Sequence, residues 1–220
     1  DSNPEPLLQR VDRAKKATVA LKKKEQEVLL EKEKAVKAEA NLVSQLAAAN
    51  KSLGDLGAEQ KKKKALTEKA AVGVKTAESQ LVVAKTKAKK ANEIVSSLEK
   101  TVNDTNETSE KEVAGKILTA AKKTLMETQA LVVRAEQELQ ESREINATAI
   151  EEQKAAEKKL ADVNSQVKQV NEQMENAVSK RKTLSEKHAS FAREFKACEK
   201  SLKKWQDELT FAQNARRESE

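Results

Sequence analysis

The sequence has little of what builds a thick globular core. Of its 220 residues only 2% are aromatic, none is Tyr, and there are four Gly, two Pro, one Cys and one His. Hydrophobic residues make up 37% and charged residues 36% of the chain. An ordinary soluble domain contains about 45–50% hydrophobic residues and about 25% charged residues. The hydrophobic residues are mainly Ala, Leu and Val in a background of Lys, Glu and Gln, which predicts an extended, all-helical protein.

Other absences bear on function. No stretch approaches the roughly 20 consecutive apolar residues of a membrane span, and no signal peptide is present, so we expect a soluble chain. His188 is the only histidine and Cys198 the only cysteine, and they are ten residues apart in the sequence. This argues against a zinc site and against a disulfide framework. There is no glycine-rich phosphate loop or dinucleotide fingerprint. The sequence therefore predicts no catalytic residues, no metal, no cofactor and no enzyme activity.

The residues that are present form a regular pattern along the first half of the chain. Of the fourteen positions that recur every seven residues from Leu7 to Leu98, thirteen are apolar, and Lys63 is the exception. Of the positions four residues after each, from Val11 to Val102, eight are apolar. In heptad notation the second set is a and the first is d. This uninterrupted seam predicts a first coiled-coil arm over residues 7–102.

A second seam follows with its own phase. Its a positions recur from Leu118 to Leu209 and its d positions from Ala121 to Ala212. Twenty-two of these 28 positions are apolar, where chance at 37% hydrophobic residues would give about ten. We therefore predict a second arm over residues 111–218.

Polar residues separate the two seams. Residues 103–110 contain no aliphatic side chain and are rich in the types that favour turns, so we expect a tip loop there, with Thr108 or Ser109 capping the second helix. Pro4 and Pro6 mark the helix start, which leaves residues 1–6 as a lead-in. The predicted fold is all-α, a long antiparallel two-helix coiled-coil hairpin.

The charges agree with this pairing. Residues 61–90 contain ten Lys and two Glu, a local balance of +8. Folding about the loop places them opposite residues 126–162, which have nine acidic and five basic residues, a balance of −4. Opposite charges on the flanks of a coiled coil set its pairing. The alternative is a three- or four-helix bundle with a turn at Gly54 and Gly57, because each glycine costs a helix about 1 kcal/mol.

Charged residues on the seam are the first candidate site. Folding about the loop places Glu39 opposite Arg181 and Lys32 near His188, with Glu25 a further charged a residue. A polar a position costs stability but fixes register, so these side chains either set the register or simply snorkel out of the seam.

Off-seam apolar residues are the second candidate. Leu29, Val36 and Val43 each follow a d position, which indicates either a wider stripe for a third helix or second copy, or a local drift of the seam. Leu8 and Phe211 also lie off the seam, near the open end of the hairpin. They mark a docking surface for another domain, unless they are ordinary exposed residues.

The lysine runs at residues 61–64 and 85–90 raise the possibility of binding nucleic acid or an anionic membrane. No aromatic residues interleave with these lysines for base stacking, and the facing arm is acidic. A solvated, partly neutralised flank is the simpler interpretation, so the sequence argues against both partners.

Three segments rich in Ala, Lys and Glu resemble segments of known proteins. They are residues 32–40, 77–85 and 144–155. They resemble the coiled-coil segments inserted in large planctomycete proteins that combine WD-repeat propellers with cytochrome c-like domains. No propeller repeat and no Cys-x-x-Cys-His haem motif is present here. The resemblance implies an insertion domain in an exported bacterial protein whose function is located elsewhere.

The function that we predict is a structural or interaction module within a larger protein, acting as spacer, projecting arm or docking surface. The chain begins with Asp1 rather than Met, which is expected of a processed protein or a segment. Its partners would be proteins, either its own copy or domains of the parent chain, with the hairpin monomeric or a weak homodimer. The alternative is an electrostatic module for anionic membrane or nucleic acid.

Overall fold

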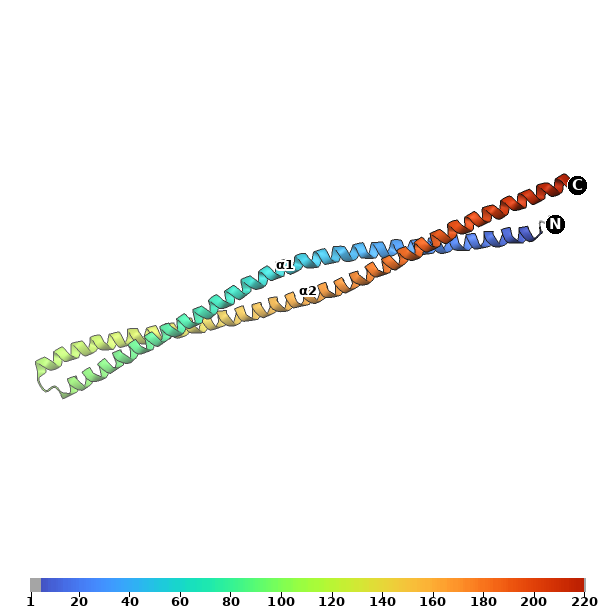
Figure 1. Ribbon diagram of the computed structural model, residues 1–220. Coiled ribbons are helices and arrows are strands. Elements are labelled where there is room, and N and C mark those ends of the chain that lie inside the picture. Colours follow the sequence, from blue (N-terminus) through green and yellow to red (C-terminus); the bar gives the residue numbers. More distant parts are fainter. Residues whose placement is uncertain (1–4, 220) are drawn as a thin grey trace. The chain divides into compact units, whose positions relative to one another are not determined.

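The computed structural model describes residues 5–219 and contains two helices (Figure 1). Helix α1 spans Glu5–Asp104, and helix α2 spans Thr108–Ser219. A short connection, residues 105–107, joins them, and the described residues form no strand. The prediction of an all-α antiparallel two-helix hairpin is confirmed. Pro6 lies in the first turn of α1, where its missing N–H has no intrahelical acceptor to lose, whereas Pro4 lies outside the described residues.

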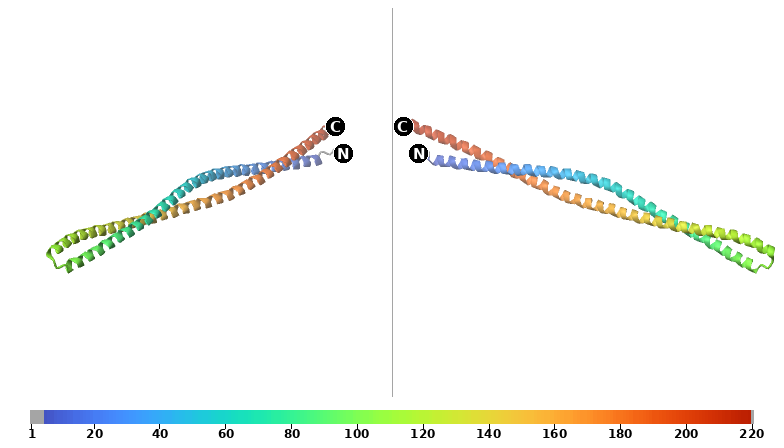
Figure 2. Two further views of the ribbon diagram at one scale, coloured as in Figure 1. Left: turned by 60° about the vertical axis from the view of Figure 1, so that its left-hand side comes forward. Right: turned by 180° about the vertical axis from the view of Figure 1, so that it is seen from behind.

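Contacts divide the chain into two units. Unit 1 combines residues up to Lys51 with residues from Asn164 onward, and unit 2 is Ser52–Val163. Within each unit a stretch of α1 lies beside a stretch of α2 that runs in the opposite direction, as the two views of Figure 2 also show. Unit 1 holds the beginning of α1 and the end of α2, and unit 2 holds the connection.

The seam residues hold each unit together. Every a and d position of the two predicted seams is buried or half-buried. The ten most buried hydrophobic residues are all seam residues: Val11, Ala35, Ala77, Ala84, Ala91, Val95, Ala135, Leu139, Ala156 and Leu184. Six of them are alanines, so the two helices have only a thin apolar layer between them. No side chain within residues 6–218 is completely enclosed.

Helix α1 continues through the predicted rival break. Gly54 and Gly57 are both helical, and no described glycine has a positive φ. Leu53 and Leu56 stay half-buried on the seam, and this packing offsets the cost of about 1 kcal/mol per glycine. The alternative of a bundle with a turn at Gly54–Gly57 is therefore wrong.

The connection is shorter than the predicted loop of residues 103–110. At the end of α1, both the backbone N–H and the hydroxyl of Thr105 donate to the Thr101 carbonyl, at 3.1 and 2.8 Å. At the start of α2, the Lys111 N–H donates to the Glu107 carbonyl at 3.0 Å. Glu107, not Thr108 or Ser109, thus holds the N-cap position. Backbone hydrogen bonds extend both helices into a polar segment, because turn-forming residues are also tolerated in terminal turns.

The off-seam stripe of unit 1 does not result from drift. Leu29, Val36 and Val43 are exposed, whereas the d residues directly before them are buried or half-buried. The seam therefore keeps its phase through this stretch, and the interpretation as local drift is wrong. The three side chains form an apolar row on the surface of α1.

Candidate functional site: charged residues along the seam

Glu39 and Arg181 form the closest ion pair on the seam of unit 1. Nε of Arg181 donates to Oε2 of Glu39 at 2.6 Å. The Glu39 side chain is 22% exposed and that of Arg181 40% exposed, so one end of the pair is shielded by the helices and the other reaches water. Both residues occupy a positions, which is why folding about the loop brings them together. Whether the pair fixes the register remains a prediction.

His188, which register places near Lys32, makes its polar contact with Glu25 instead. Its Nε2 lies 3.7 Å from Oε1 of Glu25, with both side chains about three-quarters buried. An a residue in an antiparallel coil has two a residues of the partner helix within reach, one heptad apart. Of these two, Glu25 provides the carboxylate that contacts the imidazole of His188. This contact becomes an ion pair only when the imidazole is protonated.

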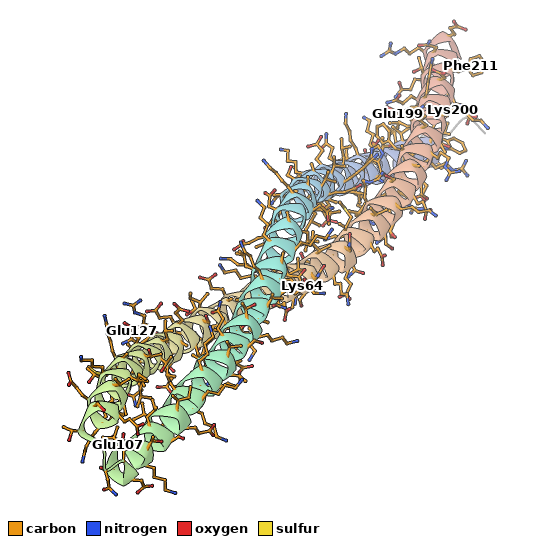
Figure 3. All side chains as sticks on the ribbon, turned by 90° about the vertical axis from the view of Figure 1, so that its left-hand side faces the viewer. Lys64, Glu107, Glu127, Glu199, Lys200 and Phe211 are labelled. Carbon is orange, nitrogen blue, oxygen red and sulfur yellow. The ribbon has the colours of Figure 1, made fainter. Side chains whose placement is uncertain are left out.

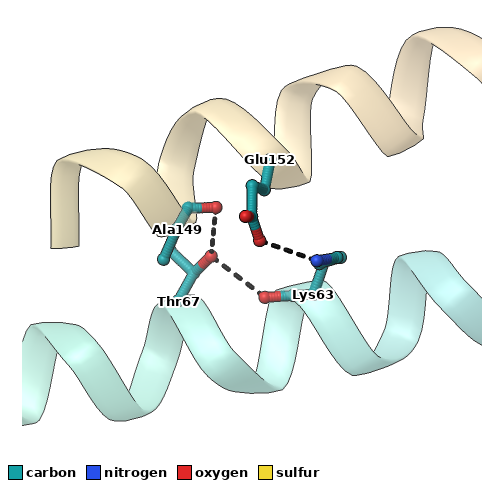
Figure 4. Close-up of polar contacts among 4 residues, drawn as sticks. All are labelled: Lys63, Thr67, Ala149 and Glu152. Carbon is teal, nitrogen blue, oxygen red and sulfur yellow. Dashed lines mark hydrogen bonds and ion pairs between the residues drawn. The ribbon is translucent and has the colours of Figure 1, made fainter. Parts of the chain in front are cut away.

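The seam of unit 2 has a polar layer at Lys63 (Figure 4). Nζ of Lys63 lies 2.7 Å from Oε2 of Glu152. The hydroxyl of Thr67 lies 3.0 Å from the Lys63 carbonyl in its own helix and 3.1 Å from the Ala149 carbonyl in α2. The hydrogen bond to Glu152, followed by the charge of Glu152, raises the pKa of Lys63 above its usual value of 10.5. This layer joins the two helices by polar bonds where an apolar d residue is absent.

A second polar layer of unit 2 lies at Asn146, an a residue. Its Oδ1 is buried, and no partner for this atom occurs among the described residues. An unsatisfied buried acceptor costs about 1–3 kcal/mol. Asn146 thus lowers the stability of the seam, as polar a residues generally do.

One flank of unit 2 is lined by interhelical ion pairs. Lys85 pairs with Glu136 at 3.1 Å, Arg143 with Glu78 at 3.3 Å, and Lys122 with Glu99 at 2.9 Å. All six residues directly follow a d position, which is heptad position e. Each pair is about half exposed, so it contributes little to stability but favours this alignment of the helices.

The two predicted docking residues are exposed on unit 1. Phe211 is 77% exposed and projects from α2, as Figure 3 shows, and Leu8 of α1 is 48% exposed. The neighbouring aromatics pack instead against the opposite helix. The Arg10 guanidinium lies 4.9 Å from the Trp205 ring centroid, and Nζ of Lys22 lies 5.8 Å from that of Phe195. The docking role of Leu8 and Phe211 remains a prediction.

The potential metal ligands and the single thiol are dispersed along the described residues. No group of three or more His, Cys, Asp or Glu side chains within residues 5–219 is arranged to hold a metal ion. Cys198 is a half-buried free thiol on the seam. Over the same range, neither helix has a stretch apolar and long enough to cross a bilayer.

Comparison with known proteins identifies the fold. No protein-family model matches the sequence, and no curated protein matches it significantly. The structure is similar to a crystal structure of a coiled-coil segment of the Smc protein from Pyrococcus yayanosii. The TM-score is 0.60, the sequences are 18% identical, and the match covers 96% of this chain and 94% of the Smc segment. At this identity the similarity shows a coiled-coil hairpin fold and nothing more specific.

Proposed function

We propose that the hairpin acts within a larger protein as a spacer or projecting arm that also offers a docking surface. One observation carries this proposal. Arg10, near the start of α1, stacks on Trp205 in the last part of α2, so these two end segments lie side by side. Between these residues the chain follows two uninterrupted helices of 100 and 112 residues.

This path suits an insertion. Adjacent ends can be joined to a surface loop of a host domain without disturbing the host. At 1.5 Å per residue, the contour of α1 alone is about 150 Å. The connection at residues 105–107 would then be carried away from the host. The resemblance to coiled-coil insertions of planctomycete WD-repeat and cytochrome c-like proteins agrees with this role, and we infer that the host supplies the activity.

Energy transfer tests the proposal. Residues 5–219, with Cys198→Ala, are inserted into a surface loop of a fluorescent protein and labelled with an acceptor dye at Gln9→Cys or Asn106→Cys. We expect normal host fluorescence, strong transfer to the dye at position 9 and little transfer to the dye at position 106. Unlabelled protein in excess suppresses transfer between molecules. Equal, strong transfer to both dyes would contradict a projecting arm.

The alternative, an electrostatic module for nucleic acid or anionic membranes, has the formal charge of +7 in its favour. However, Lys63 and Lys85 of the lysine runs are engaged by glutamates of α2. Binding to duplex DNA and to phosphatidylserine vesicles, measured over a salt series, separates the two functions. Only the alternative requires an affinity that falls steeply with salt. The absence of binding at low salt would eliminate it.

A further inference from the structure

The flank of unit 2 opposite the e-position ion pairs is open. Four hollows of about 560, 460, 490 and 290 Å³ follow one another along it. On the α1 side their floors are four alanines at d positions, Ala70, Ala77, Ala84 and Ala91. On the α2 side the floors include Ala149, Ser142, Ala135 and Thr128, which are also d residues. Small d side chains on both helices leave hollows on this side of the seam, although Ala77, Ala84 and Ala91 themselves are mostly covered.

These hollows form one continuous groove. Consecutive hollows share lining residues, namely Ile145, Gln80 and Lys87. Their floors recur every seven residues, which corresponds to about 10.5 Å along the helix. A row of holes at heptad spacing is the acceptor half of knobs-into-holes packing. The groove is therefore shaped to receive another α-helical surface with large apolar residues at the same spacing.

The rims of the groove carry large apolar side chains. Leu66 and Ile94 of α1 and Leu131 and Ile145 of α2 directly precede a positions, which is heptad position g, and they are 46–63% exposed. Leu131 and Ile145 are two heptads apart. The same face of unit 2 thus presents both holes and the knobs that fit holes of this kind.

The two walls of the groove differ in charge. The α1 wall carries Lys69, Lys87 and Lys90. The α2 wall carries the carboxylates of Glu138, Glu141, Glu144 and Glu152 against the single cation of Arg134, and Glu152 is engaged by Lys63. One wall is therefore basic and the other is mainly acidic.

We propose that this groove binds the same groove of a second copy of the chain. A twofold axis parallel to the helices places the basic α1 wall of each copy against the acidic α2 wall of the other. The knobs of one copy then face the holes of its partner, and the two hairpins form a four-helix bundle over unit 2. This inference gives the proposed docking role a specific surface and partner, and it rests on that part of the proposed function.

The size of the surface suits a specific dimer. From Leu66 to Ile94 the groove is about 42 Å long at 1.5 Å per residue, and two helices of about 10 Å diameter form its width. This footprint is about 800 Å² per copy, or about 1,600 Å² in total. Standard specific interfaces bury about 1,200–2,000 Å².

Sedimentation equilibrium of the full chain, over a series that extends to high-micromolar concentration, tests the inference. We expect wild-type dimers, and we expect Leu131→Gln/Ile145→Gln to weaken dimerisation about tenfold or more. The matched control is Val82→Gln/Val133→Gln, because both valines are exposed on unit 2 and line none of the four hollows. The control should change the dissociation constant less than twofold. Circular dichroism establishes that all variants keep the helical content of the wild type.

Charge reversal tests the orientation of the copies. Lys69 and Glu144 line the same hollow from opposite walls. Lys69→Glu and Glu144→Lys should each weaken the dimer, and the two together should restore it, because the two charges at this hollow are then exchanged. A monomer at every concentration would overturn the inference, as would a dimer that the groove variants leave intact or the control weakens equally. Each of these results leaves the energy-transfer test of the arm unaffected, since that test needs one chain only.

Discussion

Arg181 donates from Nε to Oε2 of Glu39 at 2.6 Å, across a seam that is otherwise mainly apolar. Both charges lose part of their hydration, and this cost can exceed the attraction between them. We therefore expect Glu39→Leu/Arg181→Leu to raise the free energy of unfolding by about 1–2 kcal/mol in urea titrations. Either single substitution should lower it by about 1 kcal/mol, a value reduced by the partial exposure of the pair.

The double variant also tests whether the pair sets the register. Without the pair, neighbouring alignments should become accessible, which disulfide mapping with cysteine pairs one heptad out of register would detect. If stability and register both stay unchanged, the two side chains simply snorkel out of the seam.

The Lys63–Glu152 pair makes stability depend on pH at the alkaline end. The pKa of Lys63 is higher in the folded chain than in the unfolded chain. The stabilisation from the ion pair is therefore fully present at pH values below the pKa of the unfolded chain, and it disappears as pH rises through the pKa of the folded chain. We expect Lys63→Gln to be less stable than the wild type at neutral pH, and the difference to vanish well above pH 10.5. Urea titrations at several pH values measure it. Lys62→Gln, at an exposed neighbouring position, should show no such convergence.

The alignment of the helices in unit 2 is open to a direct chemical test. In a Cys198→Ala background, cysteines at Ala91 and Leu125 should form a disulfide within one chain under mild oxidation. Ala91 is buried and Leu125 half-buried on facing seams, in a layer equivalent to that of Thr67 and Ala149. Cysteines at Val82 and Leu125 are the control and should stay reduced, because Val82 is exposed. Crosslinks found only between chains would indicate a swapped or parallel dimer.

Much of the fold could be predicted because the two seams each keep one phase. The polar segment between the two seams predicts antiparallel pairing, and this pairing is enough to place Glu39 opposite Arg181. The partner of His188 could not be predicted from register, since Lys32 and Glu25 both lie within one heptad of the facing layer. The contact is with Glu25, whose carboxylate can form an ion pair with a protonated imidazole, whereas the ammonium group of Lys32 cannot.

The heptad pattern did not predict the groove of unit 2, although the sequence contains a signal for it. Alanines occupy four consecutive d positions from Ala70 to Ala91, while g positions such as Leu66 and Ile94 carry large apolar side chains. Hydrophobicity counts treat Ala and Leu alike, and this conceals the holes. The sequence also does not show which flank of the seam stays open. The structure shows it, because ion pairs such as Lys85–Glu136 cover the opposite flank.

The glycines of α1 offer the final prediction, on the continuity of the helix. Gly54 and Gly57 have helical backbones, and a Cβ atom added to either would meet no atom within 4 Å. Alanine therefore costs no packing and removes conformational freedom from the unfolded chain. Gly54→Ala and Gly57→Ala should each raise the free energy of unfolding by about 0.8–1 kcal/mol, and together by roughly the sum. Gly115→Ala in α2, equally free of neighbours and outside the four hollows, is the reference for an ordinary helical glycine. Urea titrations that show stabilisation at Gly115 but loss of stability at Gly54 and Gly57 would mean that the chain turns at Gly54 and Gly57, and would replace the hairpin with a bundle.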